Sequence, residues 1–143
     1  MFNFFTMGRI NIFRTKEIKK EIADNPSKAK EIIDAEKELG ICVTDENGYY
    51  VHVNNRYNQI YGYDPGELTG KHFTTVVPKE MHQRLQTAHD MFIKNEYEIV
   101  RYWDVVNKKG ETIKIQAAAA FFNNICNNRG KGHKVTFVYH DDE

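Results

Sequence analysis

The spacing of hydrophobic residues changes near residue 40. Before this point, apolar residues recur every three to four positions, which is the spacing of an amphipathic helix. After it, apolar and polar residues largely alternate, as in half-buried strands. A chain of 143 residues is long enough for one hydrophobic core and too short for two. We therefore predict an N-terminal helical extension over residues 1–39 and one folded domain over residues 40–143.

Two short helices are predicted within the extension. Asn25-Pro26 separates them, because Asn is a favoured N-cap and Pro suits the first helical position. Apolar residues form a single stripe on these otherwise charged helices, and helices this short need burial to be stable. The stripe packs either on its own domain or on a second copy of the chain, and the sequence leaves both options open. As a dimer and relay surface it would consist of Ile18, Ile22, Ile32, Ile33 and Leu39.

The folded domain is predicted to contain two strands, then several helices, then three more strands. Asp45-Glu46-Asn47-Gly48 separates two β-rich runs and predicts a hairpin, since Gly tolerates the positive φ of the turn. Short helical segments are predicted over residues 54–61 and 64–67, and a longer helix from Pro78 to about Asn95. The remaining strands are predicted over residues 97–107, 111–122 and 135–139, with a loop at 123–132. This order predicts an α+β fold with an antiparallel sheet and helices on one face.

Composition and charge narrow the range of functions. Lys and Arg together number 20, as do Asp and Glu, so no basic surplus favours nucleic acid or an anionic membrane surface. Cys42 and Cys126 lack metal-binding or disulfide-framework spacing, which favours the reducing cytoplasm. Polar residues interrupt the apolar N-terminal segment, which is too short to span a membrane. No nucleophile elbow, P-loop or kinase motif occurs, so we do not expect an enzyme.

Several short segments, taken in order and spacing, closely resemble the PAS domain family. The resemblance implies a five-stranded antiparallel sheet whose inner face, with small helices, encloses a pocket. It also implies a sensor of small molecules, gas, redox state or light, or a dimerisation module, which signals through a flanking helix. The chain ends soon after the last strand, so we expect the output to pass through an unidentified partner protein or the N-terminal helix. We also expect a homodimer, formed through the N-terminal helix and the outer face of the sheet. The segments are Gly40–Gly48, Val53-Asn54, Tyr61–Tyr63, Glu67–Phe73, Val77-Pro78, Lys108–Glu111 and Val135–Val138.

A run of four alanines lies in the predicted fourth strand. Residues 117–120 place two alanines on each face, so small side chains leave room for a ligand inside and permit flat packing outside. Simple tight packing is the alternative explanation. The full set of candidate pocket residues is Asn54, Tyr57, Tyr61, Leu85, His89, Phe92, Trp103, Ala117 and Phe137.

The sequence does not determine a cofactor. The family's flavin–thiol photochemistry requires a cysteine before the long helix, and residues 72–77 contain none, although a noncovalent flavin stays open. Haem requires an inward imidazole, and His89 on the long helix is the candidate axial ligand. The alternative for His89 is a buried histidine bonded to a backbone carbonyl. His82 lies seven residues earlier, which does not match metal-ligand spacing, so no other metal site is predicted. Three functions follow: a sensor of a small ligand or partner, a ligand-free association scaffold, and a haem-based gas or redox sensor.

Overall fold

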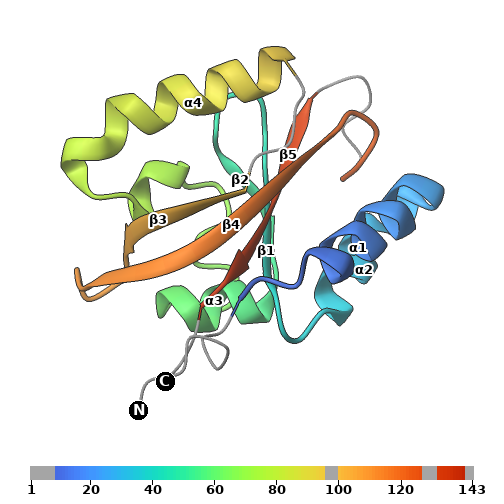
Figure 1. Ribbon diagram of the computed structural model, residues 1–143, viewed down its shortest axis with the longest axis horizontal. Helices are drawn as coiled ribbons and strands as arrows, with labels where there is room; N and C mark the ends of the chain where they lie inside the picture. Colours follow the sequence, from blue (N-terminus) through green and yellow to red (C-terminus); the bar gives the residue numbers. More distant parts are fainter. Residues whose placement is uncertain (1–8, 96–99, 127–131, 141–143) are drawn as a thin grey trace.

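The computed structural model describes residues 9–95, 100–126 and 132–140, and within them a five-stranded antiparallel sheet lies between two groups of helices (Figure 1). The strand order is β2-β1-β5-β4-β3, so the last strand lies in the middle of the sheet, beside the first. The predicted α+β class is confirmed. The expected start of the third strand at residue 97 and part of the loop at 123–132 lie outside the described residues. The strands are β1 (Gly40–Thr44), β2 (Tyr50–Val53), β3 (Val100–Val106), β4 (Thr112–Phe122) and β5 (His133–Tyr139).

The helices divide between the two faces of the sheet. Figure 1 shows α4 on one face, here called the inner face, and α1 with α2 on the other, the outer face. α3 packs against β1 at the end of the inner face. The α-helices are α1 (Ile12–Asp24), α2 (Ala29–Ala35), α3 (Asn55–Tyr61) and α4 (His82–Asn95), and the short 3₁₀ helices are η2 (Pro26–Lys28), η3 (Phe73–Val76) and η4 (Lys79–Met81).

The predicted hairpin forms between β1 and β2. The carboxylate of Asp45 accepts hydrogen bonds from the backbone N–H groups of Asn47 and Tyr49, both at 2.9 Å. Gly48 has φ +89°, the left-handed conformation that glycine adopts without strain. A Cβ atom at this position would lie only 2.7 Å from the ring of Phe73. The turn therefore depends on glycine for its conformation and for its contact with η3.

Three predicted helix starts differ from the structure. The helix predicted from Pro78 begins as the 3₁₀ helix η4, and α4 starts only at His82. Residues 64–67 form a turn, because Gly66 has φ +82° and ends any helical continuation. The expected capping interaction still forms there, with Glu67 Oε1 accepting from the N–H of Asp64 at 3.0 Å. Pro26 begins a 3₁₀ turn instead of an α-helix, and the side chain of Asn25 makes no capping bond. The α-helix α2 starts only at Ala29.

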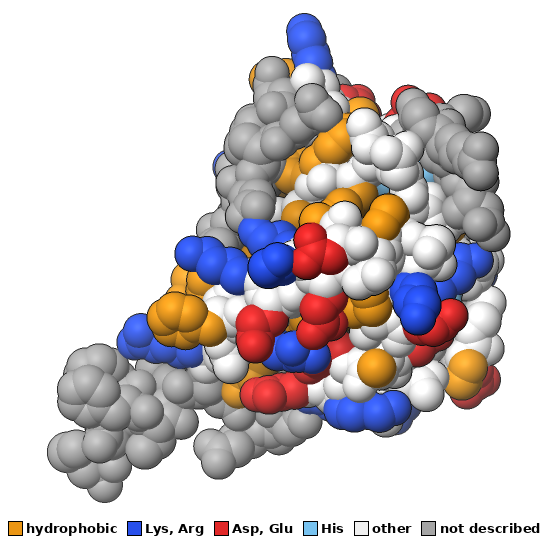
Figure 2. Space-filling model, turned by 90° about the vertical axis from the view of Figure 1, so that its right-hand side faces the viewer, with side chains coloured by type: hydrophobic (Ala, Val, Ile, Leu, Met, Phe, Trp, Pro, Cys, Tyr) orange, Lys and Arg blue, Asp and Glu red, His pale blue; other side chains and the backbone are white. Residues whose placement is uncertain are grey.

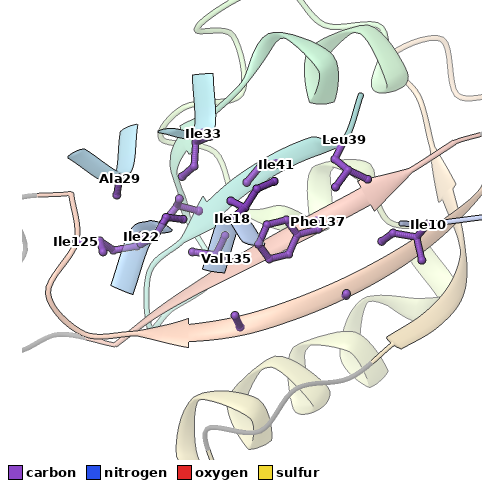
Figure 3. Close-up of a cluster of buried hydrophobic side chains, with 13 residues drawn as sticks. Ile10, Ile18, Ile22, Ala29, Ile33, Leu39, Ile41, Ile125, Val135 and Phe137 are labelled. Carbon is purple, nitrogen blue, oxygen red and sulfur yellow. The ribbon is translucent and has the colours of Figure 1, made fainter. Parts of the chain in front are cut away.

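The apolar stripe of the N-terminal extension packs on the outer face of its own sheet (Figure 3). Ile18, Ile22, Ile33 and Leu39 are fully buried, while Ile32 is partly buried at the edge of this cluster. Of the two options left open by the sequence, the structure shows the stripe packed on its own domain; its role in a dimer or relay stays a prediction. The boundary at residues 39 and 40 stays a prediction, since α1 and α2 share one hydrophobic cluster with the sheet. The sheet contributes six residues to this cluster: Ile41, Val43, Ala118, Ala120, Val135 and Phe137.

A buried carboxylate joins α1 to the segment between α2 and β1. Glu36 accepts from Arg14 Nε at 2.9 Å and from the backbone N–H groups of Glu38 and Leu39 at 3.0 Å. Burial opposes ionisation, but the bond from the Leu39 N–H, the Arg14 guanidinium and the Glu38 N–H together lower the pKa of Glu36. Elsewhere on the side of the molecule where α1 and α2 lie, positive and negative side chains are interspersed (Figure 2). The ion pair between Arg14 and Glu36, together with the bonds of Glu36 to the backbone of Glu38 and Leu39, fixes the direction in which the chain enters β1.

Candidate functional site

A cavity of about 110 Å³ lies between the inner face of the sheet and the helices α3, α4 and η3. Every strand of the sheet contributes to its lining, so the cavity sits in the middle of the inner half of the domain. Much of the wall is apolar, as expected for a site that binds small molecules. The apolar lining residues are Phe73, Val76, Val77, Leu85, Ala88, Trp103, Val105, Ile115, Ala117 and Val138.

The size of the cavity limits what it holds. An engineered cavity of about 150 Å³ in another protein accommodates benzene. Sites for larger ligands and cofactors usually enclose about 300–1,000 Å³. At about 110 Å³ the present cavity suits a molecule no larger than a single ring. This space is smaller than the sites that usually enclose cofactors of the size of haem or flavin.

Buried hydroxyl groups and a thiol form a polar seam along one wall of the cavity. The hydroxyl groups of Tyr50 and Tyr57 lie 2.8 Å apart, and the rings of Tyr57 and Tyr61 are in edge contact at 4.3 Å. Burial raises the pKa of the Cys42 thiol to about 11, against the smaller opposing effects of Tyr57, Lys134 and Thr136. Burial also raises the pKa of each of the three tyrosines. The seam is therefore neutral at physiological pH, and the thiol is not a nucleophile.

His89 anchors the β1–β2 turn to α4. Its Nε2 lies 3.1 Å from the carbonyl oxygen of Asp45 and 3.2 Å from that of Glu46, so this nitrogen carries a proton and donates. Burial, assisted by the positive charge of Lys134, lowers the pKa of His89, which is consequently neutral at pH 7. The turn is held a second time by His72, whose Nε2 contacts the carbonyl oxygen of Asn47 at 2.9 Å. His89 thus has the structural role given above as the alternative to haem ligation.

Lys134 brings a positive charge to the cavity. It lies on the inner face of β5, directly opposite Thr44 of β1 in the strand register. Its ammonium group lies 5.1 Å from the centre of the Phe92 ring, a distance typical of a cation–π contact. Thr136, two residues along the same strand, also lines the cavity. The described lining contains no aspartate or glutamate.

Of the nine candidate pocket residues, the structure brings six together around the cavity. These are Tyr57, Tyr61, Leu85, His89, Trp103 and Ala117. Phe137 lies on the opposite side of the sheet, in the outer cluster, because β5 directs Lys134, Thr136 and Val138 inward. Phe92 is buried on α4 but lies outside the lining. The sequence interpretation missed Lys134 and Thr136, and the strict alternation of β5 was the signal for their shared face.

Asn54 also lies outside the cavity, where it joins three segments of the chain. Its Oδ1 accepts from the backbone N–H of Ile41 at 2.9 Å and from that of Tyr57 at 3.0 Å, which caps α3. Its Nδ2 donates to the carbonyl oxygens of Ile33 and Leu39, both at 3.1 Å. One fully buried amide therefore connects the end of α2, the start of β1 and the helix that carries two cavity tyrosines.

The described part of the chain offers neither a metal site nor a membrane span. Its histidine, cysteine, aspartate and glutamate side chains nowhere gather in groups of three that would hold a metal ion. None of its helices is long and apolar enough to cross a membrane.

The structure thus combines a five-stranded antiparallel sheet with an inner-face cavity that short helices cover. The model of the PAS fold family matches residues 38–120. The chain belongs to this family, whose members are sensory signalling modules and are not generally catalytic. A search of curated proteins gave no significant match.

Solved PAS domains share the fold at low sequence identity. A PAS domain from Colwellia psychrerythraea has a TM-score of 0.66 and 16% identity, covering 87% of this chain and 97% of that one. The PAS domain of an HTR-like protein from Haloarcula marismortui has a TM-score of 0.62 and 18% identity, covering 88% and 99%. A domain of a sensory box sensor histidine kinase/response regulator from Geobacter sulfurreducens has a TM-score of 0.58 and 14% identity, covering 92% and 99%. At these identities the similarity concerns the fold alone.

Proposed function

We propose that this domain senses a small molecule that binds in the inner cavity. The observation that carries the proposal is the cavity itself, a largely apolar space of about 110 Å³ with several polar groups on its wall. Natural cores are packed closely and contain few voids of this size. A void kept open in the middle of a sensory fold is best explained by a ligand that fills it.

The relay to the outer face would run through α3 and Asn54. A ligand in contact with Tyr57 and Tyr61 presses on α3, whose first turn is bonded to Asn54. The same amide holds the carbonyl oxygens of Ile33 and Leu39. Occupancy of the cavity would thereby shift the segment that positions α1 and α2, and a partner protein would read that shift.

The two free cysteines support a reducing, cytoplasmic setting.

Filling the cavity tests the proposal. Ala117→Leu adds a branched side chain to the lining, whereas Ala35→Leu adds the same group at an exposed position of α2. Compounds of single-ring size, screened by thermal unfolding, should raise the melting temperature of the wild type and of Ala35→Leu but not of Ala117→Leu. Equal stabilisation of all three proteins would place binding elsewhere and contradict the proposal.

A second candidate function is association without a ligand, as a homodimer or with another protein. Two large apolar side chains favour it: Phe13 on α1 is 82% exposed and Tyr102 on β3 is 77% exposed. Aromatic residues of this kind are enriched at interfaces. If they form an interface, Phe13→Ser and Tyr102→Ser should lower the sedimentation mass of the protein at a given concentration, with the fold unchanged by circular dichroism. An unchanged mass would remove this candidate.

A further inference from the structure

Three hydroxyl groups, here called the tyrosine row, lie in the wall of the inner cavity and belong to Tyr50, Tyr57 and Tyr61. The oxygens of Tyr50 and Tyr57 lie 2.8 Å apart and share a hydrogen bond. The hydroxyl of Tyr57 also acts on that of Tyr61, where it partly offsets the increase in pKa that burial causes. All three side chains line the cavity and are at most 3% exposed. The tyrosine row is therefore a buried and connected part of the cavity wall.

The protons of the tyrosine row outnumber the hydrogen bonds within it. Each bond between two hydroxyl groups uses one proton, and among the described contacts no bond joins Tyr50 to Tyr61, so the row is open and shares at most two of its three protons. Cys42 is a further neighbour of the row, but its sulfur is only a weak acceptor. A buried donor without an acceptor is costly. The row thus has one donor to spare for a molecule in the cavity.

The rest of the described lining favours an uncharged molecule. It contains no aspartate or glutamate, and His89 is neutral because burial lowers its pKa. The positive charge in the lining belongs to Lys134, whose ammonium group lies 5.1 Å from the centre of the Phe92 ring. This charge therefore already has a partner within the protein. The hydrogen bond that the cavity has to offer comes from a neutral phenol group.

We infer that the ligand of this cavity is a neutral molecule of about single-ring size, with one oxygen that accepts a hydrogen bond from the tyrosine row, as in a small cyclic ketone. The inference rests on the proposed function and names the class of ligand. The apolar part of the molecule would lie against Val105, Ile115 and Ala117, where the lining offers no polar side chain. A volume of about 110 Å³ limits that part to a few carbon atoms or a single small ring.

The test compares two ligands of nearly equal shape, of which only one has an acceptor. Cyclopentanone and methylenecyclopentane are titrated separately into the full chain at neutral pH, with binding followed by amide chemical shifts. A wholly apolar cavity would favour the hydrocarbon, because the ketone gives up its hydrogen bonds with water. We expect the ketone to bind at least as tightly as the hydrocarbon, with the largest shifts in β1, β2 and α3.

A variant without the tyrosine row separates its effect from that of the remaining wall. Tyr50→Phe/Tyr57→Phe/Tyr61→Phe keeps the three rings, and removing bonded partners together costs little stability. All three hydroxyl groups are replaced, because a shortened row would still have a proton to spare. The ratio of ketone to hydrocarbon affinity should fall about threefold to tenfold, the value of one hydrogen bond. Tyr49→Phe/Tyr102→Phe makes the same change at exposed positions and should leave the ratio unchanged.

The outcomes distinguish this inference from the function on which it rests. Tighter binding of the hydrocarbon to the wild type overturns the acceptor assignment and needs no variant, and an equal ratio in the triple variant overturns it as well. Isobutyrate serves as an anionic probe of similar size, and tighter binding of isobutyrate than of cyclopentanone would refute a neutral ligand. Each of these results leaves the sensor function standing. If none of the three compounds binds, the cavity does not take ligands of this size and the proposed function fails too.

Discussion

Replacement of Asn54 by alanine removes the connection between the cavity helix and the N-terminal helices. The amide makes four well-formed bonds to Ile41, Tyr57, Ile33 and Leu39, at 2.9–3.1 Å, and is 1% exposed. Loss of an Asn N-cap costs about 1 kcal/mol. Each buried backbone group left without a partner costs about 1–3 kcal/mol, less where water enters the space left by the side chain. We therefore expect Asn54→Ala to lower the free energy of unfolding by about 3 kcal/mol.

A loss of this size is a large fraction of the stability of an ordinary domain, about 5–15 kcal/mol. Asn54→Ser separates the two halves of the interaction, because its hydroxyl caps α3 but does not reach Ile33 and Leu39. We expect Asn54→Ser to lose about 2 kcal/mol, less than alanine by the value of the cap. Asn55→Ala is the matched control, since Asn55 is the exposed neighbour on the same helix and should change stability by less than about 0.5 kcal/mol.

Equilibrium unfolding in urea gives these free energies directly. Trp103 is the only tryptophan in the chain and lies in the cavity wall, so its fluorescence reports the inner half of the domain. Far-ultraviolet circular dichroism, dominated by the helices, reports α1 and α2 alongside it. If Asn54→Ala and Asn54→Ser are no less stable than Asn55→Ala, Asn54 does not hold the three segments together, and the proposed relay loses its connection.

Three further predictions concern the outer core, the hairpin and pH. Ile33→Ala should lose about 2–5 kcal/mol of unfolding free energy, since Ile33 is fully buried, whereas Ile32→Ala at the cluster edge should lose clearly less; equal losses by denaturant unfolding would contradict the packing described. Gly48→Ala and Gly66→Ala both place alanine at positive φ, but only at Gly48 does the new Cβ collide with the ring of Phe73. The melting temperature of Gly48→Ala should therefore fall further than that of Gly66→Ala, and similar melting temperatures would argue against the contact with Phe73. Because the pKa of Glu36 is lowered below 4.5 in the folded chain, its stabilisation is complete above about pH 4.5 and is lost as the pH falls through the folded value. Glu36→Gln should therefore show a smaller loss of stability than the wild type between neutral and acidic pH, and parallel pH profiles would refute this.

The hydrophobic pattern predicted the fold because its local signals agree with the tertiary structure. The Asn-Gly turn, the long helix after Pro78 and the alternation of β4 each depend on neighbours in the sequence, and each was found. Residues 64–67 carried signals for both a helix start and a turn, and the positive φ of Gly66 decided in favour of the turn. Local chemistry thus determined the elements, and where two signals conflicted the backbone of a single glycine decided.

The cavity was harder to predict, because its lining depends on which side of each strand faces inward. In β5 the apolar residues Val135 and Phe137 look like the core side, yet they face the outer helices. The inner positions hold Lys134 and Thr136, which resemble solvent-facing residues in sequence. A sheet covered on both faces removes the usual rule that polar residues point to water. Only the register of β5 between β1 and β4 reveals the difference.

The sharing of one hydrophobic cluster by α1, α2 and the sheet has a consequence for dividing this protein into pieces. The family match begins at residue 38, and a fragment cut there would lose both helices. Ile41, Val43, Val135 and Phe137 would then form a continuous apolar surface exposed to water. Such a surface favours aggregation, or exchange of the α1–α2 unit between chains when it is present but detached. A dimer observed with a shortened fragment would consequently result from the surface that the loss of α1 and α2 exposes, and would not represent the natural assembly.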